Sequence, residues 1–348
     1  MDEFGMTKIK KEQINRSNLI GSGTIGQVFQ GTVKDLGGSD VTPVAIKMLQ
    51  ESASSQKKMK FLNEAKLMSQ FCHKNVLKLL GSCLDVDPPL LILELMEAGD
   101  LLNYLRESRT LEPSDPHALR LQDLLAMCED VARGCCYLEG LHIAHKDLAC
   151  RNCLVSARNR ENRIVKIGNF GLDRDIYKDD YYHMKGKDIL YFLSWMAPEC
   201  LKYQKFTSQS DVWAFGVLMW EITFLGEHPY TVKNKSEISQ YVSEGIKLPK
   251  PLNCPPTLYE LMQQCWNVEA NDRPNFTHCL QNILILRDNI EDAVLSSIDI
   301  NRPVKFPPSG QIEDLVRSTA NVSTLEHLTT NDASNDVRTF DVIVSLTE

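Results

Sequence analysis

The sequence predicts an α+β protein with two lobes, a small β-rich lobe followed by a larger helical lobe. Up to about Leu95 the chain carries short aliphatic and β-branched runs around Gly-rich turns, a pattern typical of strands. Over residues 100–288 the hydrophobic spacing is mostly helical, interrupted by a polar segment at 173–187. Beyond residue 290 the composition shifts to Ser, Thr, Asn and Asp without sustained periodicity, which predicts a largely disordered tail.

The small lobe is expected to hold strands and one helix. Its strands are predicted by the segments NLIGSGTIGQVFQGTV, which contains two, TPVAIKML, VLKLLGSCL and LLILELM. Between the third and fourth strands, segment 55–71 has helical spacing, with Phe61, Leu62, Ala65 and Met68 on one apolar face.

In the larger lobe, the apolar run from Val212 to Gly226 contains Glu221 and is too short to cross a bilayer. It therefore predicts a buried core helix. No signal peptide or transmembrane segment is visible, and a short docked helix is expected at 312–317 in the tail. The expected divisions are an N-terminal extension, two lobes and the tail, at residues 1–13, 14–96, 97–290 and 291–348.

Composition excludes some classes of function. The net charge of −8 argues against a nucleic-acid-binding protein, which would carry a basic excess. The 11 cysteines are odd in number and scattered, a pattern that favours free thiols over a disulfide framework. Cys150 and Cys153 form a C-x-x-C pair, but no second pair stands at zinc spacing, so two loop thiols are the better interpretation than a metal or redox site.

A glycine motif begins the candidate site. Gly21, Gly23 and Gly26 in GSGTIGQV fit a dinucleotide-binding turn, a flap that covers nucleotide phosphates, or an ordinary β-hairpin. A dinucleotide site would place a helix after the turn, whereas here a strand-like run follows, with Val28 placed to close over a base. Glycines let backbone N–H groups approach phosphate oxygens without a Cβ in the way.

The next charged residues strengthen the phosphate-flap interpretation. Lys47 in VAIK lies on the following strand and could reach phosphates, and Glu64 on the next helix could hold it in place. Further on, in AHKDLACRNCLV, Asp147 would orient a hydroxyl and take its proton. Arg151 and Asn152 follow, and the Asn152 side-chain oxygen could hold a magnesium ion.

Further residues suggest structural roles. Asp211, in SDVWAFG, could accept hydrogen bonds from backbone N–H groups near the catalytic loop. Arg273, in NDRPNF, is a candidate ion-pair partner for Glu199 in WMAPE.

Together these motifs resemble the protein kinase fold over about residues 14–290. DLACRN is similar to the tyrosine-kinase catalytic loop, and FLNEAKLMSQFCHKNVLKLLGSCL with LILELMEAGDLLNYLR resembles the Ros/Sevenless receptors most. The resemblance implies a bilobal fold that binds ATP. It places adenine against the hinge from Glu94 to Met96, with Ala45 lining the nucleotide site and Asp100 near the ribose.

The same resemblance implies regulation and location. DIYKDDYY resembles an activation loop of the insulin-receptor-like group, which makes Tyr177, Tyr181 and Tyr182 candidate phosphorylation sites. It also implies a place on the cytoplasmic side of the plasma membrane as part of a receptor, with protein partners docking on the lobes and with homo- or heterodimerisation.

The sequence departs from the family pattern at the metal site. Asn169 in NFG stands where kinases carry an aspartate that chelates magnesium, and a neutral amide loses the strongest electrostatic anchor for that ion. Lys146 replaces an arginine that grips the phosphorylated loop, Asp173 replaces an alanine, and ILYFLSW lacks the proline and basic residue of the peptide-docking loop. These changes favour a pseudokinase with weak or absent Mg²⁺ binding. The alternative is an active tyrosine kinase with a reduced rate, in which Asn152 and Asn169 share the metal.

Overall fold

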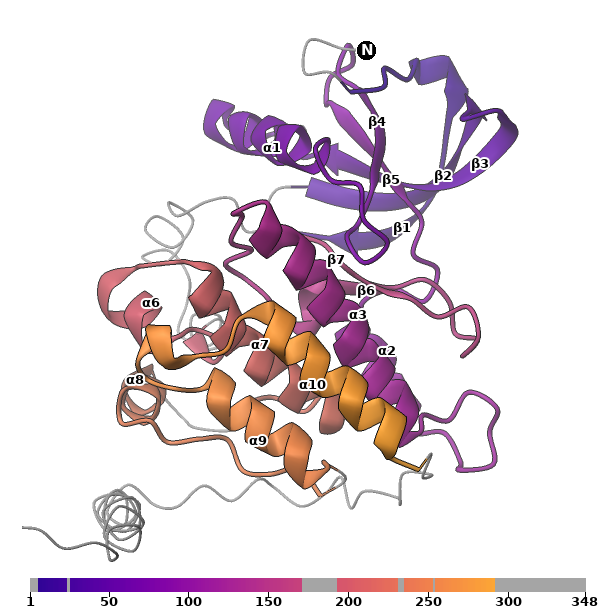
Figure 1. Ribbon diagram of the computed structural model, residues 1–348. Coiled ribbons are helices and arrows are strands. Elements are labelled where there is room, and N and C mark those ends of the chain that lie inside the picture. Colours follow the sequence, from indigo (N-terminus) through magenta and orange to yellow (C-terminus); the bar gives the residue numbers. More distant parts are fainter. Residues whose placement is uncertain (1–5, 24–25, 171–192, 231–234, 253, 292–348) are drawn as a thin grey trace, which may run out of the picture. The chain divides into compact units, whose positions relative to one another are not determined.

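The structure is a computed structural model that describes residues 6–23, 26–170, 193–230, 235–252 and 254–291. These residues lie in one compact unit that spans residues 1–301. Figure 1 shows a β-rich lobe with one helix, followed by a helical lobe, as the sequence predicts.

The small lobe is built on one five-stranded antiparallel sheet with the strand order β1-β2-β3-β5-β4. Its elements, preceded by the 3₁₀ turn η1 (Lys11–Gln13), are β1 (Ile14–Ser22), β2 (Gly26–Leu36), β3 (Ser39–Leu49), α1 (Ser55–Met68), β4 (Leu79–Cys83) and β5 (Leu90–Glu94). Helix α1 begins at the cap residue Ser54, whose hydroxyl accepts from Lys57 N. Its inward face differs from the prediction at one point, because Glu64 is buried while Leu62 is only half-buried.

The larger lobe is mostly helical, with one two-stranded sheet beside the small lobe (Figure 1). Its elements are α2 (Leu101–Ser108), α3 (Leu121–Gly140), η2 (Cys150–Asn152), β6 (Cys153–Val155), β7 (Val165–Ile167), α6 (Pro198–Tyr203), α7 (Ser208–Thr223), α8 (Lys235–Ser243), α9 (Pro256–Cys265), η3 (Ala270–Asp272) and α10 (Phe276–Asn289). Helix α7 is buried from Ser210 to Thr223, which confirms the predicted core helix. No helix in the described part of the chain is long and apolar enough to cross a membrane.

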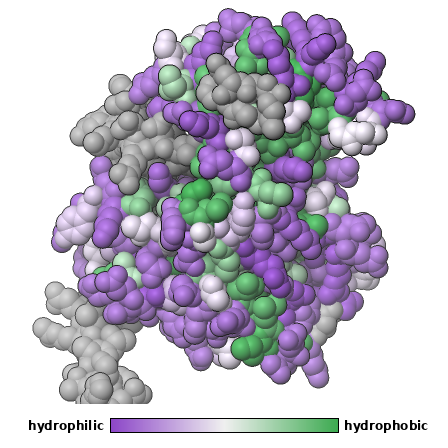
Figure 2. Space-filling model, turned by 45° about the horizontal axis from the view of Figure 1, so that its top comes forward, coloured by the Kyte–Doolittle hydropathy of each residue, from purple (hydrophilic) through white to green (hydrophobic). Residues whose placement is uncertain are grey.

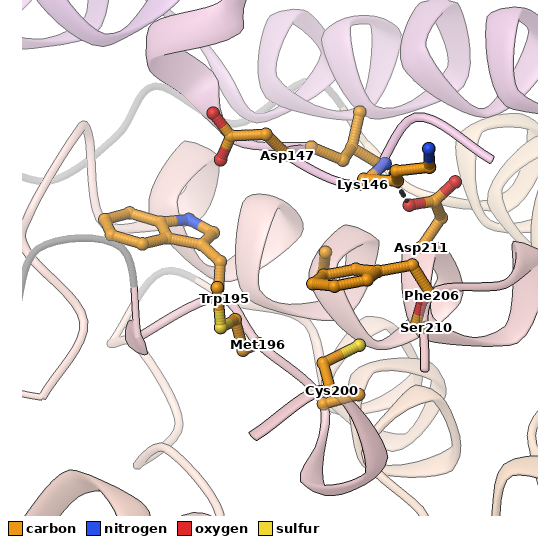
Figure 3. Close-up of a pocket in the computed structure, with 11 residues that line it drawn as sticks. Lys146, Asp147, Trp195, Met196, Cys200, Phe206, Ser210 and Asp211 are labelled. Atoms are coloured by element: carbon orange, nitrogen blue, oxygen red, sulfur yellow. Dashed lines mark hydrogen bonds between the residues drawn. The ribbon is translucent and has the colours of Figure 1, made fainter. Parts of the chain in front are cut away.

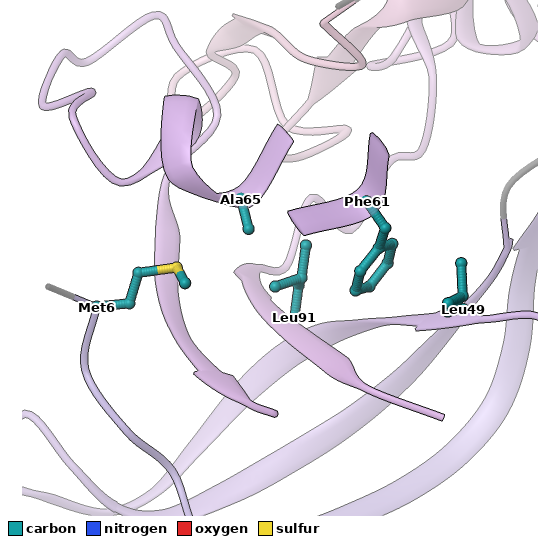
Figure 4. Close-up of a cluster of buried hydrophobic side chains, with 5 residues drawn as sticks. All are labelled: Met6, Leu49, Phe61, Ala65 and Leu91. Carbon is teal, nitrogen blue, oxygen red and sulfur yellow. The ribbon is translucent and has the colours of Figure 1, made fainter. Parts of the chain in front are cut away.

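Residues 6–9 pack on the small lobe, although the sequence predicted 1–13 as a separate extension. Thr7 and Ile9 exchange backbone hydrogen bonds with Ser82 of β4, at 2.9 and 2.8 Å. Met6 enters a hydrophobic cluster with Phe61 and Ala65 of α1, and with Leu49 and Leu91 (Figure 4). The segment therefore extends the sheet at β4 and also contacts α1.

The surface is largely polar on the face drawn in Figure 2, and its hydrophobic side chains form separate patches. Large exposed apolar side chains in the described part include Met59, Tyr203 and Leu252. Scattered apolar residues of this kind are normal on a protein surface.

Candidate functional site

The glycine motif lies in the hairpin between β1 and β2, where Gly21 pairs with Val28 and Gly23 N donates to Gly26 O at 2.8 Å. A Cβ on Gly26 would lie 2.2 Å from Met48 O, so packing against β3 requires this glycine. A Cβ added to Gly21 or Gly23 would have its nearest neighbour at 3.7 or 3.9 Å, so this side of the hairpin is open. Because a strand follows the turn, a dinucleotide-binding turn is excluded here.

The predicted lysine–glutamate pair is formed. Lys47 Nζ lies 2.6 Å from both carboxylate oxygens of Glu64, which joins β3 to α1. Both side chains are largely buried, with 14% and 6% of their surfaces exposed. The pair holds an ammonium group beside the glycine hairpin, where Val28 pairs with Lys47 across β2 and β3.

The residues of the predicted catalytic loop also come together. The Asp147 carboxylate forms an ion pair with Arg151 and accepts from Asn152 Nδ2 at 2.7 Å. The Arg151 guanidinium lies over the Trp195 ring, 4.4 Å from its centroid. Asp147 is therefore held in one orientation from two sides.

Asp211 at the start of α7 fixes the backbone of this loop, as the sequence predicted. Its carboxylate accepts from His145 N at 2.5 Å and from Lys146 N at 2.9 Å, and Lys146 adopts a left-handed φ of 71°. Burial raises the pKa of Asp211 to about 7 despite these hydrogen bonds. His145 Nδ1 accepts from Asp147 N and Nε2 faces Gly168 O at 3.0 Å, so the proton of the neutral ring belongs on Nε2.

A cavity of about 10 Å³ lies between this loop and α7, with room for about one water molecule. Figure 3 shows Asp147 and Trp195 at one end of this pocket and Ser210 with Asp211 at the other. Trp195 Nε1 donates to Glu221 of α7 at 2.7 Å, and Glu221 also accepts from Cys150 N at 3.1 Å. Burial raises the pKa of Glu221 to about 7.

Asn169 is exposed and has a left-handed φ of 52°. Its neighbour Phe170 is buried between Phe71 and His145, at ring-centroid distances of 4.8 and 5.0 Å. The buried Phe170 thus anchors the segment on both lobes, and position 169 itself faces solvent.

The predicted hinge residues lie at the end of β5 and just after it. The Glu94 carboxylate accepts from Lys78 N at 2.7 Å and from Lys166 Nζ of β7 at 2.7 and 2.8 Å. Met96 and Ala45 are buried, each with 8% of its surface exposed. Met96 N donates no hydrogen bond within the described ranges, which leaves it available to an acceptor on a ligand.

Asp100, expected near the ribose, is the N-cap of α2. Its two carboxylate oxygens accept from Asn103 N and Nδ2, at 2.9 and 2.8 Å. A contact with ribose stays a prediction.

The protein side chains offer Mg²⁺ few anionic ligands. Both hydrogen bonds of Asn152 Nδ2 go to Asp147, so its oxygen is the atom left for a metal. Asn169 adds a second neutral oxygen donor. No cluster of three or more His, Cys, Asp or Glu residues suited to a metal exists in the described part of the chain. Because Mg²⁺ favours carboxylate and phosphate oxygens, the residues present fit this ion poorly without a bound phosphate.

The structure describes some of the other predicted residues and not the rest. Arg273 forms a two-pronged ion pair with Glu199 at 2.7 and 2.8 Å, which confirms that prediction. Cys150 and Cys153 are buried free thiols, and burial raises the pKa of both, so the structure supports neither metal nor redox use. Tyr177, Tyr181, Tyr182 and Asp173 lie outside the described residues, as does the expected helix at 312–317.

Three features of the site were not predicted from the sequence. The Phe71–Phe170 contact and the Glu94–Lys166 ion pair join distant segments and left no local signal. Glu221 did leave one, because a single carboxylate within a continuous apolar helix must find buried hydrogen-bond donors.

Comparisons with known proteins agree with this geometry. A sequence profile of the protein tyrosine and serine/threonine kinase family matches residues 14–283. The mouse proto-oncogene tyrosine-protein kinase ROS is 49% identical over 283 residues, which cover 80% of this chain and 12% of that protein. The transforming protein ros of UR2 avian sarcoma virus is 48% identical over 280 residues, covering 78% of this chain and 69% of the viral protein. Drosophila melanogaster Sevenless is 44% identical over 298 residues, which span 84% of this chain but only 12% of Sevenless.

Proposed function

Because the chain belongs to the protein tyrosine and serine/threonine kinase family, with a kinase domain similar to those of ROS and Sevenless, we propose that it is a pseudokinase. In this proposal it binds ATP, transfers phosphate slowly or not at all, and acts through conformation and protein docking. The observation that carries the proposal is the neutral Asn169 at the metal-binding position.

The chemical reason is electrostatic. A divalent ion supplies charge neutralisation between the transferring phosphates, and an anionic carboxylate anchors it far more strongly than an amide oxygen. Loss of about 3–5 kcal/mol of transition-state stabilisation would slow transfer by a factor of about 10²–10⁴. The remaining residues would still orient a substrate hydroxyl through Asp147.

Nucleotide binding rests on a different set of residues. The Lys47–Glu64 pair is intact, the glycine hairpin is open on the side of Gly21 and Gly23, and Met96 N is available to an acceptor. These features support ATP binding without a strong need for metal.

A tyrosine kinase of reduced rate is the second candidate. The assembled Lys47–Glu64 pair, the oriented Asp147 and the packed Phe170 favour it, because these parts of a catalytic scaffold are in place although the charge at position 169 is missing. In that case Tyr177, Tyr181 and Tyr182 would be autophosphorylation sites.

Phosphate transfer to a tyrosine peptide, measured on the wild type, Asn169→Asp and Asp147→Ala, tests the proposal. We expect wild-type turnover near that of Asp147→Ala, and a gain of about 10²–10⁴ in Asn169→Asp. Turnover of the wild type at the rate of Asn169→Asp, abolished in Asp147→Ala, would establish the active kinase instead.

The setting of the domain is also a proposal. Similarity to ROS and Sevenless supports a place on the cytoplasmic side of the plasma membrane within a receptor, with partners docking on the lobes and with homo- or heterodimerisation. Fractionation of cells that express the full-length protein, with surface labelling of its extracellular part, tests this placement.

A further inference from the structure

Residues 6–9 form a strap along β4, which is an edge strand of the five-stranded sheet. Ser82 N of β4 donates to Thr7 O at 2.9 Å, and Ile9 N donates to Ser82 O at 2.8 Å. A Cβ on Gly81 would lie 2.5 Å from Thr7 O and 2.6 Å from Ile9 Cδ1, so this close approach requires a glycine in β4. Backbone contacts therefore fix the strap to the edge of the sheet.

The two ends of the strap pack on opposite faces of the sheet. Met6 is 3% exposed and belongs to a hydrophobic cluster that includes Leu91 of β5. Ile9 is 2% exposed and belongs to a second cluster that includes Ile92, the next residue of the same strand. Because neighbouring residues of a strand point to opposite faces, Met6 and Ile9 lie on either side of the sheet. Displacement of the strap would expose both side chains.

On the side of the sheet, Met6 shares a face with Lys47. Leu49 belongs to the Met6 cluster and follows Lys47 by two residues on β3. Figure 4 shows Met6 at one end of this cluster and Leu49 at the other. Residues two apart on a strand point to the same face, so the Lys47 side chain leaves the sheet on the face where Met6 packs.

On the side of the helix, Met6 packs on the part of α1 that carries Glu64. Phe61 and Ala65 belong to the Met6 cluster, and they lie three residues before and one residue after Glu64. All three of these α1 side chains are buried. Met6 therefore lies against the turn of the helix that presents Glu64 to Lys47, whose Nζ is 2.6 Å from both carboxylate oxygens.

We propose that the strap positions the nucleotide site: it holds α1 where Glu64 reaches Lys47, and its detachment lowers the affinity for nucleotide. This role rests on the proposed function, in which ATP binds beside the Lys47–Glu64 pair. The physical reason is close packing, because removing the Met6 side chain from a filled cluster lets α1 shift relative to β3. Met6 is a positioning residue, since it acts through the helix.

The affinity of the full chain for ATP without Mg²⁺, measured by titration calorimetry where every variant is folded, tests this role. Met6→Ala should weaken binding at least about threefold, and Gly81→Ala should do the same by pushing the strap off β4. Met6→Leu keeps an apolar side chain of similar volume and should restore binding. Met59→Ala is the matched control, because Met59 is 60% exposed on α1, and should leave affinity unchanged. Wild-type affinity in Met6→Ala would overturn the proposal.

A double-mutant cycle separates the positioning of Glu64 from a general loosening of the fold. In Glu64→Gln the carboxylate is already lost, so adding Met6→Ala should weaken ATP binding no further. Weakening by the same factor in both backgrounds would contradict an effect that passes through the ion pair.

A readout without nucleotide keeps this test separate from that of the proposed function. Acetylation of Lys47 by acetic anhydride, followed by mass spectrometry, should be at least about threefold faster in Met6→Ala, because displacement of Glu64 uncovers the amine. Lys58, which is exposed on α1, is the internal reference. If the wild type binds no ATP while Lys47 reacts faster in Met6→Ala, the proposed function fails and the positioning of Glu64 stands. Equal acetylation of Lys47 in both proteins would overturn the role of the strap.

Discussion

At position 169 the backbone has a φ of 52°, in the left-handed region that asparagine and aspartate both tolerate. The side chain is exposed, so neither residue would meet a packing penalty there. An exchange between the two therefore changes the charge and little else. This makes Asn169→Asp a clean variant for the metal site.

Glu221 is a second residue whose ionisation can be tested, and unlike Asn169 it is buried. It lies within an apolar helix with 1% of its surface exposed, and it holds both Trp195 and Cys150 N. The Trp195 ring in turn contacts the Arg151 guanidinium, so Glu221 supports the predicted catalytic loop through Trp195.

Glu221→Gln should change how stability depends on pH. Burial raises the pKa of Glu221 from 4.5 to about 7 in the folded state, so folding takes up a proton between these values. The stability from this group is present below about pH 4.5 and lost as pH rises through about 7. Relative to Glu221→Gln, the wild-type free energy of unfolding should fall by up to about 1.4 kcal/mol per pH unit in this window. Chemical denaturation at several pH values measures it, and a constant difference would contradict the assignment.

At the scale of elements, the position of α1 depends on residues outside the predicted lobe. Residues 6–9 pair with β4, and Met6 fills the space between α1 and the sheet (Figure 4). A Cβ on Gly81 would lie 2.5 Å from Thr7 O, so β4 carries a glycine where the segment approaches. The segment and α1, which carries Glu64, therefore share one hydrophobic cluster.

Met6→Ala should lower the free energy of unfolding by about 2 kcal/mol, because it leaves a cavity against Phe61 and Ala65. Met59→Ala is the matched control on α1, since Met59 is 60% exposed, and should change stability by less than about 0.5 kcal/mol. Urea denaturation measures both variants. Hydrogen exchange at Ile9 and Ser82 should also accelerate in Met6→Ala, and equal effects of the two variants would contradict the packing role.

How much of the site could be predicted from the sequence depends on how far apart along the chain the interacting residues lie. Asp147 and Asn152 lie within one short motif, so spacing alone brought them together. Lys47 and Glu64 sit on a strand and a helix whose periodicity is readable. Met6 gave no such signal, because its burial depends on an edge of the sheet that forms only after β4 and α1 have packed.

At the scale of the whole compact unit, contacts between the lobes reinforce the predicted hinge. Glu94 on β5 pairs with Lys166 on β7, and Asn75 Nδ2 donates to Val165 O at 3.0 Å. The family resemblance predicted Glu94 in the hinge for its backbone groups, and nothing in the sequence indicated that its carboxylate pairs with Lys166. The ion pair depends on how the two lobes meet, which no local pattern records.

Lys166→Met should destabilise the protein by about 1–3 kcal/mol, because it leaves the partly buried Glu94 carboxylate without its cation. Lys8→Met is the control, since the Lys8–Asp85 pair is exposed and should contribute less than about 1 kcal/mol. Thermal and urea denaturation compare the two. If Lys166→Met lost no more stability than Lys8→Met, the Glu94–Lys166 pair would not have the predicted role.

ATP affinity of the wild type and of Asn169→Asp, each with and without Mg²⁺, tests the central claim most directly. Titration calorimetry or a nucleotide-dependent melting shift reports binding without requiring turnover. We predict that Mg²⁺ leaves wild-type affinity for ATP nearly unchanged and strengthens that of Asn169→Asp by about tenfold or more. An equal magnesium-dependent gain in both proteins would contradict the claim that the amide at position 169 fails to hold the ion.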